Sequence, residues 1–286
     1  MFVPIQEPNN LIIRLIGIGE SGGKLIQKMI KKPVENVFYI TIDHNEQRLS
    51  KMMAHHKLLV TSAEQQQKVI ELLKGVDFLL IYVDIDNEED FNIAQALIQT
   101  SNNTLVVIAA QYLQENAQII ERTKKLYTDH SCIVHFDLQK ECEIYQLDEQ
   151  EAKNYLEQRL IQFSHLPNIM SCPGLINIDI QDVCSILWGA ANAFFIIESA
   201  SGKNRVELII NKFIEQAKFR YSSQVNAVLL NIQSGLNLEL DEINLILDGI
   251  HSISNEAGTI IFGTSISEHD SKTMTVMGIF ACETSG

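Results

Sequence analysis

Continuous apolar runs separated by helical patterns are the feature that most constrains the fold of this chain. Runs such as 77–83 and 104–109 contain few polar residues and are rich in Leu, Ile and Val. Such runs are typical of parallel strands covered on both faces by the helices that connect them. The first half therefore predicts an α/β fold with a Rossmann-like parallel sheet. The expected strands are 11–17, 37–42, 57–60, 77–83, 104–109 and 132–136, and the expected helices are 21–32, 63–74, 88–100 and 114–128.

The pattern changes after a long amphipathic helix at 149–166. Beyond residue 173, helices and β-rich segments alternate differently, as expected of a smaller α+β domain. We expect a parallel-sheet domain at 1–147, a central helix with its connector at 148–172, and the second domain at 173–286. Its expected helices begin at 180, 204 and 240, and its expected strands are 194–199, 224–232, 259–264 and 273–281.

Composition excludes several function classes. The 286 residues carry a formal net charge of −14, which disfavours direct binding to nucleic acid or to an anionic membrane. No apolar run reaches membrane-spanning length, and residues 1–10 do not resemble a signal peptide, so we expect a cytoplasmic protein. The five cysteines include no pair at C-x-x-C spacing and are expected to be reduced thiols. No metal site is expected, because His130 and Cys132 share one face of their strand while His135 takes the other.

A glycine-rich segment, Gly-Ile-Gly-Glu-Ser-Gly-Gly at 17–23, follows the first strand and opens the first helix. Glycines there allow close approach of a phosphate to a helix N-terminus. The spacing fits the dinucleotide fingerprint G-x-G-x-x-G, with Asp43 as the ribose-binding acid. A P-loop fits less well, because Leu25 replaces the metal-binding Ser or Thr. A turn that only packs helix on strand is the structural alternative. The candidate cofactor contacts here are Gly17, Gly19, Gly22, Gly23, Lys24 and Asp43.

A second polar segment lies at the start of the second domain. Residues 173–183 read Pro-Gly-Leu-Ile-Asn-Ile-Asp-Ile-Gln-Asp-Val, which places Asn177, Asp179 and Asp182 at the mouth of a helix that starts near Ile180. Asp179 and Asp182 have capping spacing, so helix capping alone explains the two aspartates.

Together these segments resemble the FtsZ family, the bacterial homologues of tubulin. The chain is similar to the family at 16–29, where Lys24 replaces the usual asparagine, and at 39–49, 173–183, 200–205, 227–232 and 258–263. The resemblance implies the tubulin/FtsZ fold, with a GTPase-like domain, a central helix and a C-terminal activation domain. It further implies GTP or GDP as ligand. Asn177, Asp179 and Asp182 would be the catalytic residues, which reach into the neighbouring subunit's GTP site and position the attacking water.

The expected phosphate-binding loop departs from the family pattern. Where the family has Gly-Gly-Gly-Thr-Gly-Thr-Gly, this chain has Asp-Asn-Glu-Glu-Asp-Phe-Asn at 86–92. The glycine flexibility is lost and like charge faces the phosphates. The same acids suit the first turn of a helix, whose free amides and dipole they would satisfy. We therefore expect GTP binding to be weakened or lost, with Mg²⁺ present only if nucleotide binds.

The expected guanine contacts are only partly retained. Glu115 matches a family glutamate, but Ile119 stands where the family has arginine. The base-reading aspartate of the central helix corresponds to Glu157 or to Asn154, and the sequence does not choose between them.

Three functions follow as hypotheses. The first is a cytoskeletal or scaffold protein that forms head-to-tail filaments, as in cell division, with slow or absent GTP hydrolysis. The second is a non-polymerising pseudo-GTPase that binds and modulates a true FtsZ or another partner. The chain ends soon after its last strand, so we expect no tethering through the family's C-terminal membrane-adaptor peptide. The third, an NAD-dependent enzyme, leaves residues 173–263 unexplained.

Overall fold

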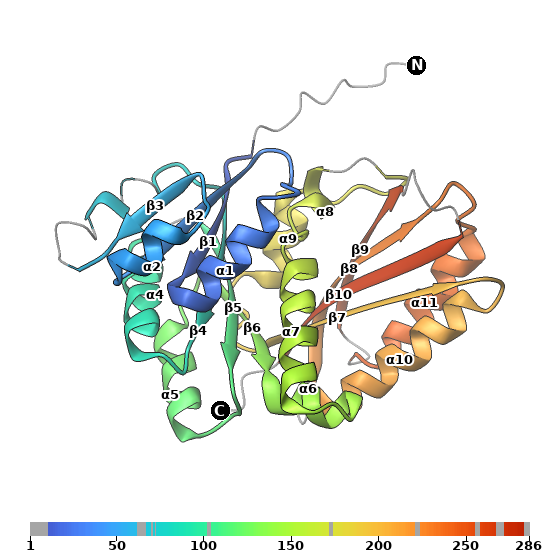
Figure 1. The fold of residues 1–286 in the computed structure, drawn as a ribbon. Coiled ribbons are helices and arrows are strands. Elements are labelled where there is room, and N and C mark those ends of the chain that lie inside the picture. The colour runs from blue at the N-terminus through green and yellow to red at the C-terminus, as the bar shows by residue number, and fades with distance from the viewer. Residues whose placement is uncertain are drawn as a thin grey trace, which may run out of the picture.

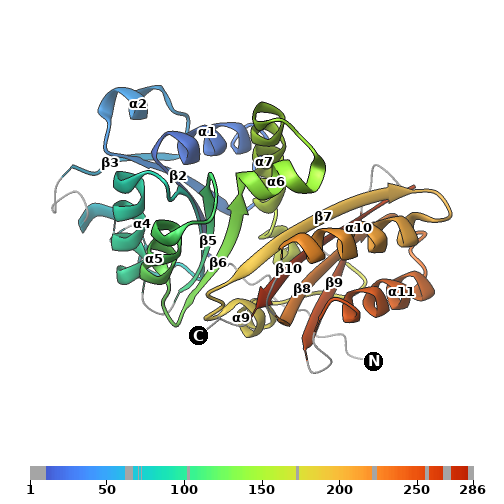
Figure 2. The same cartoon turned by 90° about the horizontal axis from the view of Figure 1, so that it is seen from below.

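The computed structural model describes residues 11–61, 67–69, 71, 73–101, 104–171, 174–220, 224–254, 258–266 and 272–282. Cys172, Pro173 and part of the helix expected at 63–74 lie outside these ranges. Figures 1 and 2 show two lobes side by side, with a long helix, α7, between them.

The first lobe is built on six parallel strands, as the apolar runs predict. They lie in the order β3-β2-β1-β4-β5-β6, and every neighbouring pair is parallel. This is the order of doubly wound nucleotide-binding sheets. The strands are β1 (Ile13–Ile18), β2 (Val37–Asp43), β3 (His56–Leu59), β4 (Phe78–Asp84), β5 (Leu105–Tyr112) and β6 (Ser131–Asp137). The helices around them are α1 (Gly19–Met29), α2 (Glu46–Lys51), α4 (Glu88–Thr100) and α5 (Ala117–Leu126).

The second lobe continues the same sheet. A single residue pair, Val134 with Ala193, joins β6 to β7, and β10 then runs antiparallel between β7 and β8. The strands of this lobe are β7 (Ala193–Ser201), β8 (Val225–Ser234), β9 (Thr259–Ile266) and β10 (Thr273–Cys282). The helices after β6 are α6 (Leu138–Tyr145), α7 (Glu149–Phe163), α8 (Asn168–Ser171), α9 (Ile180–Leu187), α10 (Arg205–Arg220) and α11 (Leu240–His251). The expected elements other than the helix at 63–74 are confirmed, whereas α2, α6 and α8 were not predicted.

Three apolar clusters hold the lobes together. One packs α1, α7 and α9 against one face of the first sheet, and another packs α4 and α5 against the opposite face. Figure 2 shows these helices on the two sides of the sheet. The third cluster lies beneath α10 and α11 in the second lobe. Helix α7 contributes Ala152, Leu156, Leu160 and Phe163 to the first cluster, at the helical spacing that its sequence predicts.

A buried charge cluster joins α6, α7 and α10. Glu141 of α6 is fully buried and accepts hydrogen bonds from Arg159 of α7 at 2.7 and 2.9 Å and from Arg220 of α10 at 2.8 and 3.1 Å. Burial alone would raise the pKa of Glu141, but the two guanidinium groups outweigh it and lower that pKa. Because each arginine comes from a different helix, this acid fixes the central helix to both lobes.

Within the described ranges, no helix is both long enough and apolar enough to span a membrane.

Candidate functional site

The glycine-rich segment is shorter as a loop than the sequence suggests. Helix α1 begins at Gly19, directly after β1, and Gly19 has a φ of +68°, which favours glycine. Gly17 and Gly22 lie backbone to backbone, and a Cβ on either would collide with the other. Gly23 faces Thr41 and Met52. Close packing of α1 on the sheet therefore accounts for three of the four glycines.

Asp90 covers the remaining glycine. Its carboxylate lies so close to Gly19 that a Cβ there would overlap it. Asp90 belongs to the first turn of α4, which Asn87 caps by accepting a hydrogen bond from the Asp90 N–H at 3.0 Å. The expected acidic first turn is thus confirmed. The side chain of one of these acids, Asp90, points away from the end of α4 and occupies the space beside the start of α1.

The environment of Asp90 disfavours its charge. The residue is 4% exposed, and its Oδ1 is buried without a hydrogen-bond partner. The Nδ1 atom of His44 lies 3.9 Å from Oδ1. Burial, followed by the nearby charge of Asp43, raises the pKa of Asp90 to about 6.

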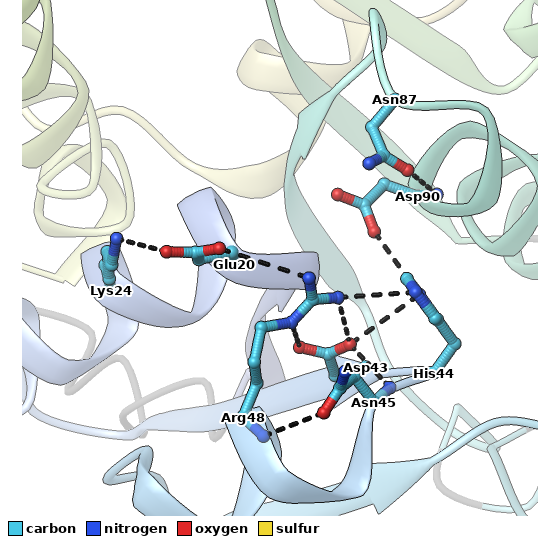
Figure 3. A network of polar contacts seen from close by, with 8 residues as sticks. All are labelled: Glu20, Lys24, Asp43, His44, Asn45, Arg48, Asn87 and Asp90. Atoms are coloured by element: carbon cyan, nitrogen blue, oxygen red, sulfur yellow. Dashed lines mark hydrogen bonds and ion pairs between the residues drawn. The ribbon is translucent and has the colours of Figure 1, made fainter.

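Asp43, the predicted ribose-binding acid, has an internal partner. It is fully buried at the end of β2, and Arg48 of α2 donates to both of its oxygens at 2.8 and 3.0 Å (Figure 3). The Asn45 N–H adds a third hydrogen bond at 2.8 Å. Burial alone would raise the pKa of Asp43, but these donors outweigh it and lower that pKa.

The two cations beside the glycine segment are both engaged with carboxylates. The Lys24 Nζ atom lies 2.5 Å from one carboxylate oxygen of Glu20. The Arg48 guanidinium lies 4.0 Å from the other oxygen of Glu20 and also forms an ion pair with Asp43 (Figure 3). Glu20, Asp43 and Asp90 thus bring three acids to a place with two permanent cations. Any anion that bound here would have to displace these internal ion pairs.

The β4–α4 loop is held in place by β5 and α5. The Ile85 N–H donates to the Gln111 carbonyl at 2.9 Å, and the Leu113 N–H donates to the Asp86 carboxylate at 2.6 Å. Buried Arg122 donates to the carbonyls of Ile85 and Asp86 at 2.6 and 2.8 Å. These bonds hold the loop in one conformation.

Among the described residues, the side chains of the predicted base contacts form no hydrogen bond with this network. Glu115 is exposed in the loop between β5 and α5, and its backbone N–H donates to Asp137. On the central helix, Glu157 accepts from Lys28 of α1 at 2.5 Å, whereas Asn154 interacts with Gln150 of its own helix. Of the two alternatives, Glu157 is therefore the one that faces α1.

The segment 174–182 is anchored to the second lobe and capped locally. Asp179 and Asp182 form a reciprocal capping box at the start of α9, with bonds of 2.9 and 3.0 Å. The Asn177 side chain accepts from the Gly174 N–H at 2.9 Å. Ile176 and Thr264 of β9 exchange two hydrogen bonds of 2.8 and 2.9 Å. All three predicted catalytic side chains are thus used in local hydrogen bonds, while Asn177 and Asp179 remain exposed.

The two predicted half-sites lie at opposite ends of the molecule. The glycine segment follows β1, at the edge where the parallel strands end. Helix α7 follows β6 and runs back along the sheet, from the edge where the parallel strands end to the edge where they begin. Helix α8 and segment 174–179 lie at that second edge (Figure 1). At the other end of α9, the Trp188 ring lies 6.4 Å from that of His130, which precedes β6. One chain cannot bring its two half-sites together, but successive copies placed head to tail could.

Sequence reasoning identified Asp43, the acidic segment 86–92 and the glycines but missed the residues that bind them. Arg48 lies five residues after Asp43 in a short helix that was not predicted, and nothing in the local sequence pairs them. Arg122 lies 36 residues from the loop carbonyl of Asp86. Only the parallel packing of β4 and β5 brings these groups together.

A parallel sheet in this strand order, joined through a central helix to a smaller mixed-sheet lobe, is the architecture of the tubulin/FtsZ fold. Structures of FtsZ from M. jannaschii superpose with high similarity. A tryptophan-to-tyrosine mutant gives a TM-score of 0.82 at 17% identity, covering 94% of this chain and 90% of that one. An empty dimer gives 0.81 at 18%, covering 95% and 88%. A GTPγS-bound protofilament of CetZ2 from Haloferax volcanii gives 0.75 at 13%, covering 96% and 94%.

Sequence comparison agrees with the fold. The C-terminal domain model of the FtsZ family matches residues 176–282. Cell division protein FtsZ from Buchnera aphidicola subsp. Acyrthosiphon pisum is 25% identical, covering 96% of this chain and 80% of the relative. That from Wigglesworthia glossinidia brevipalpis is 24% identical, covering 93% and 78%. The chain is a member of the tubulin/FtsZ superfamily, and its similarity to FtsZ extends through both lobes.

Proposed function

We propose that this protein is an FtsZ-like cytoskeletal protein that assembles head to tail and has weakened or lost GTP binding. The observation that carries the proposal is the Asp90 carboxylate on Gly19. A phosphate approaching the start of α1 would meet this carboxylate. At about 4 Å, two unit charges repel by roughly 1 kcal/mol in water and roughly 4 kcal/mol at an intermediate dielectric.

The other groups around the glycine segment support the same proposal. Lys24 and Arg48 are already paired with acids, and Arg122 holds the β4–α4 loop in place. The residues present do not fit a bound triphosphate. In this proposal Asn177, Asp179 and Asp182 serve the subunit junction and the start of α9.

Head-to-tail assembly is supported by the placement of the two half-sites at opposite ends of the chain (Figure 1). A heterologous contact that does not close by rotation gives an open filament. Similar solved structures include an FtsZ dimer and protofilaments of CetZ2 and TubZ. By analogy, the exposed segment 174–179 of one copy would face α1 and the β4–α4 loop of the next.

Calorimetry with GTP and Mg²⁺ on nucleotide-stripped protein, together with sedimentation of the same sample, tests the proposal. We expect no heat of binding at millimolar GTP and concentration-dependent assembly without nucleotide. Micromolar binding would overturn the loss of GTP binding. A monomer at every concentration, which instead co-sediments with a true FtsZ polymer, would favour the modulator hypothesis.

A further inference from the structure

A pocket with a mixed polar and apolar lining lies on the first lobe, far from the glycine segment. It is formed where β1, β2 and β3 begin, whereas the glycine segment lies where those strands end. Its volume is about 400 Å³, within the usual range for sites that hold small molecules. None of its lining residues is acidic. They are Leu11, Ile12, Ile13, Arg14, Asn36, Phe38 and His56.

Two guanidinium nitrogens of Arg14 have no acceptor among the residues that the structure describes. Its Nε and Nη1 atoms are buried without hydrogen-bond partners, and no carboxylate of the described ranges lies within ion-pair distance. The acid closest in the strand register, Asp77, instead accepts from the Ile12 N–H at 2.8 Å. Burial lowers the pKa of Arg14, but a guanidinium remains charged in proteins. A buried charged donor without an acceptor costs free energy, so it requires an explanation.

The surrounding side chains orient the guanidinium and add donors. Its carbon lies 5.8 Å from the centre of the Phe38 ring, a cation–π distance that holds the plane in place. Phe38 is itself packed between His55 and His56, at centroid distances of 5.0 and 5.1 Å. His56 and Asn36 line the pocket and can both donate hydrogen bonds. The lining therefore offers cationic and neutral donors and no competing acid.

We infer that the Arg14 pocket binds the oxyanion group of a small molecule, either a carboxylate or a phosphate. A planar guanidinium held on an aromatic ring matches such groups in charge and geometry. The apolar rim of Leu11 and Ile12 would contact the uncharged part of the ligand. This inference does not depend on nucleotide binding, because the pocket lies at the opposite edge of the sheet from the glycine segment.

The test is titration of the full-length, ¹⁵N-arginine-labelled protein with sodium phosphate and, separately, with sodium acetate and sodium benzoate. Sodium chloride keeps the ionic strength constant. We expect the side-chain Nε resonance of Arg14, assigned by its absence in Arg14→Lys, to shift and saturate. Saturation with phosphate alone or with carboxylates alone identifies the ligand class, and saturation with both supports the shared oxyanion chemistry.

Two variants separate a site from general charge effects. Arg14→Met should weaken anion binding, as measured by thermal shift, by at least roughly tenfold, because charge-assisted hydrogen bonds are lost. Lys124→Met removes an exposed cation elsewhere and should bind the anions like the wild type.

The inference is overturned if none of the three anions gives a saturable shift of the Arg14 resonance. A shift of Arg48 in place of Arg14 also overturns it, because it would locate the anion at the glycine segment. If Arg14→Met does not fold, the wild-type resonance still decides.

Discussion

At the scale of single residues, Asp90 determines the space and the charge that a ligand would meet at the glycine segment. It is a helix-terminal acid whose side chain is buried against Gly19, with His44 and Arg48 as nearby basic residues. Acids at a helix start are normally stabilising and solvated. Here the same sequence feature is used to close a space, at the cost of burying a carboxylate next to Asp43.

Because Asp90 has a raised pKa in the folded state, its ionisation opposes folding. Its contribution to stability is fully present below the unfolded pKa of 3.8 and is lost as the pH rises through about 6. The difference between these values corresponds to about 3 kcal/mol. Asp90→Asn should therefore raise the free energy of unfolding at pH 8 by roughly 1–3 kcal/mol, and by only about a third of that amount at pH 4.5. Urea unfolding at both pH values measures this.

Glu89→Gln is the matched control, since it removes one charge from the same helical turn at an exposed position. Its effect at pH 8 should stay within about 0.5 kcal/mol. A loss of stability in Asp90→Asn at pH 8 would instead mean that the interactions of the Asp90 carboxylate with His44 and Arg48 outweigh the cost of burying it.

The acids of this turn could be predicted from the sequence, but their tertiary role could not. Capping patterns are local, and they correctly placed Glu88, Glu89 and Asp90 at the start of α4. Gly19 lies 71 positions earlier in the chain, and the contact depends on how α1 and α4 pack on opposite faces of one sheet. Sequence predicted that like charge would face the site, without identifying which acid enters it.

At the scale of elements, the start of α9 allows the capping role of Asp179 to be tested separately from a catalytic role. Asp179 accepts the Asp182 N–H as N-cap, and an asparagine side chain can accept the same bond. Asp179→Asn should keep the wild-type stability, whereas Asp179→Ala should lose about 1 kcal/mol. Thermal or urea unfolding of both variants checks this. Equal losses in the two variants would show that the charge, and not the hydrogen bond, stabilises α9.

Three helices depend on the buried carboxylate of Glu141. Replacing it with alanine leaves Arg159 and Arg220 as buried charges without their partner, which should cost about 3–5 kcal/mol. The exposed ion pair of Lys153 with Glu149 is the control, and Lys153→Ala should cost at most about 1 kcal/mol. A small loss in Glu141→Ala, measured by urea unfolding, would mean that water enters between α6, α7 and α10.

At the scale of the whole molecule, the fold was largely predictable because the apolar runs set both strand number and direction. The strand at 77–83 and the helix at 88–100 were located within two residues of their observed ends. The continuity of the sheet through Val134 and Ala193 was not predictable, because one residue pair leaves no pattern in the sequence. The placement of the two half-sites at opposite ends was not predictable either, because it depends on the path of α7 in three dimensions.

The proposed filament would bring two acidic ends together, which predicts an unusual response to salt. Glu20, Glu88 and Glu89 are exposed at one end and Asp179 at the other, on a chain of net charge −14. Repulsion between these ends reaches about 30 Å at 0.01 M salt but only about 10 Å at 0.1 M. Assembly should therefore strengthen as sodium chloride is raised over this range, as measured by sedimentation velocity without nucleotide.

A charge-reversed variant makes this prediction specific to the junction. Glu88→Lys with Glu89→Lys replaces repulsion by attraction towards Asp179, so the variant should assemble at low salt and lose assembly as salt increases. Glu207→Lys, at an exposed position on α10, makes a charge reversal away from the proposed junction and should keep the wild-type salt response. Assembly of the wild type that weakens with salt would contradict the proposed pairing of ends, because attraction between unlike surfaces would then hold the copies together.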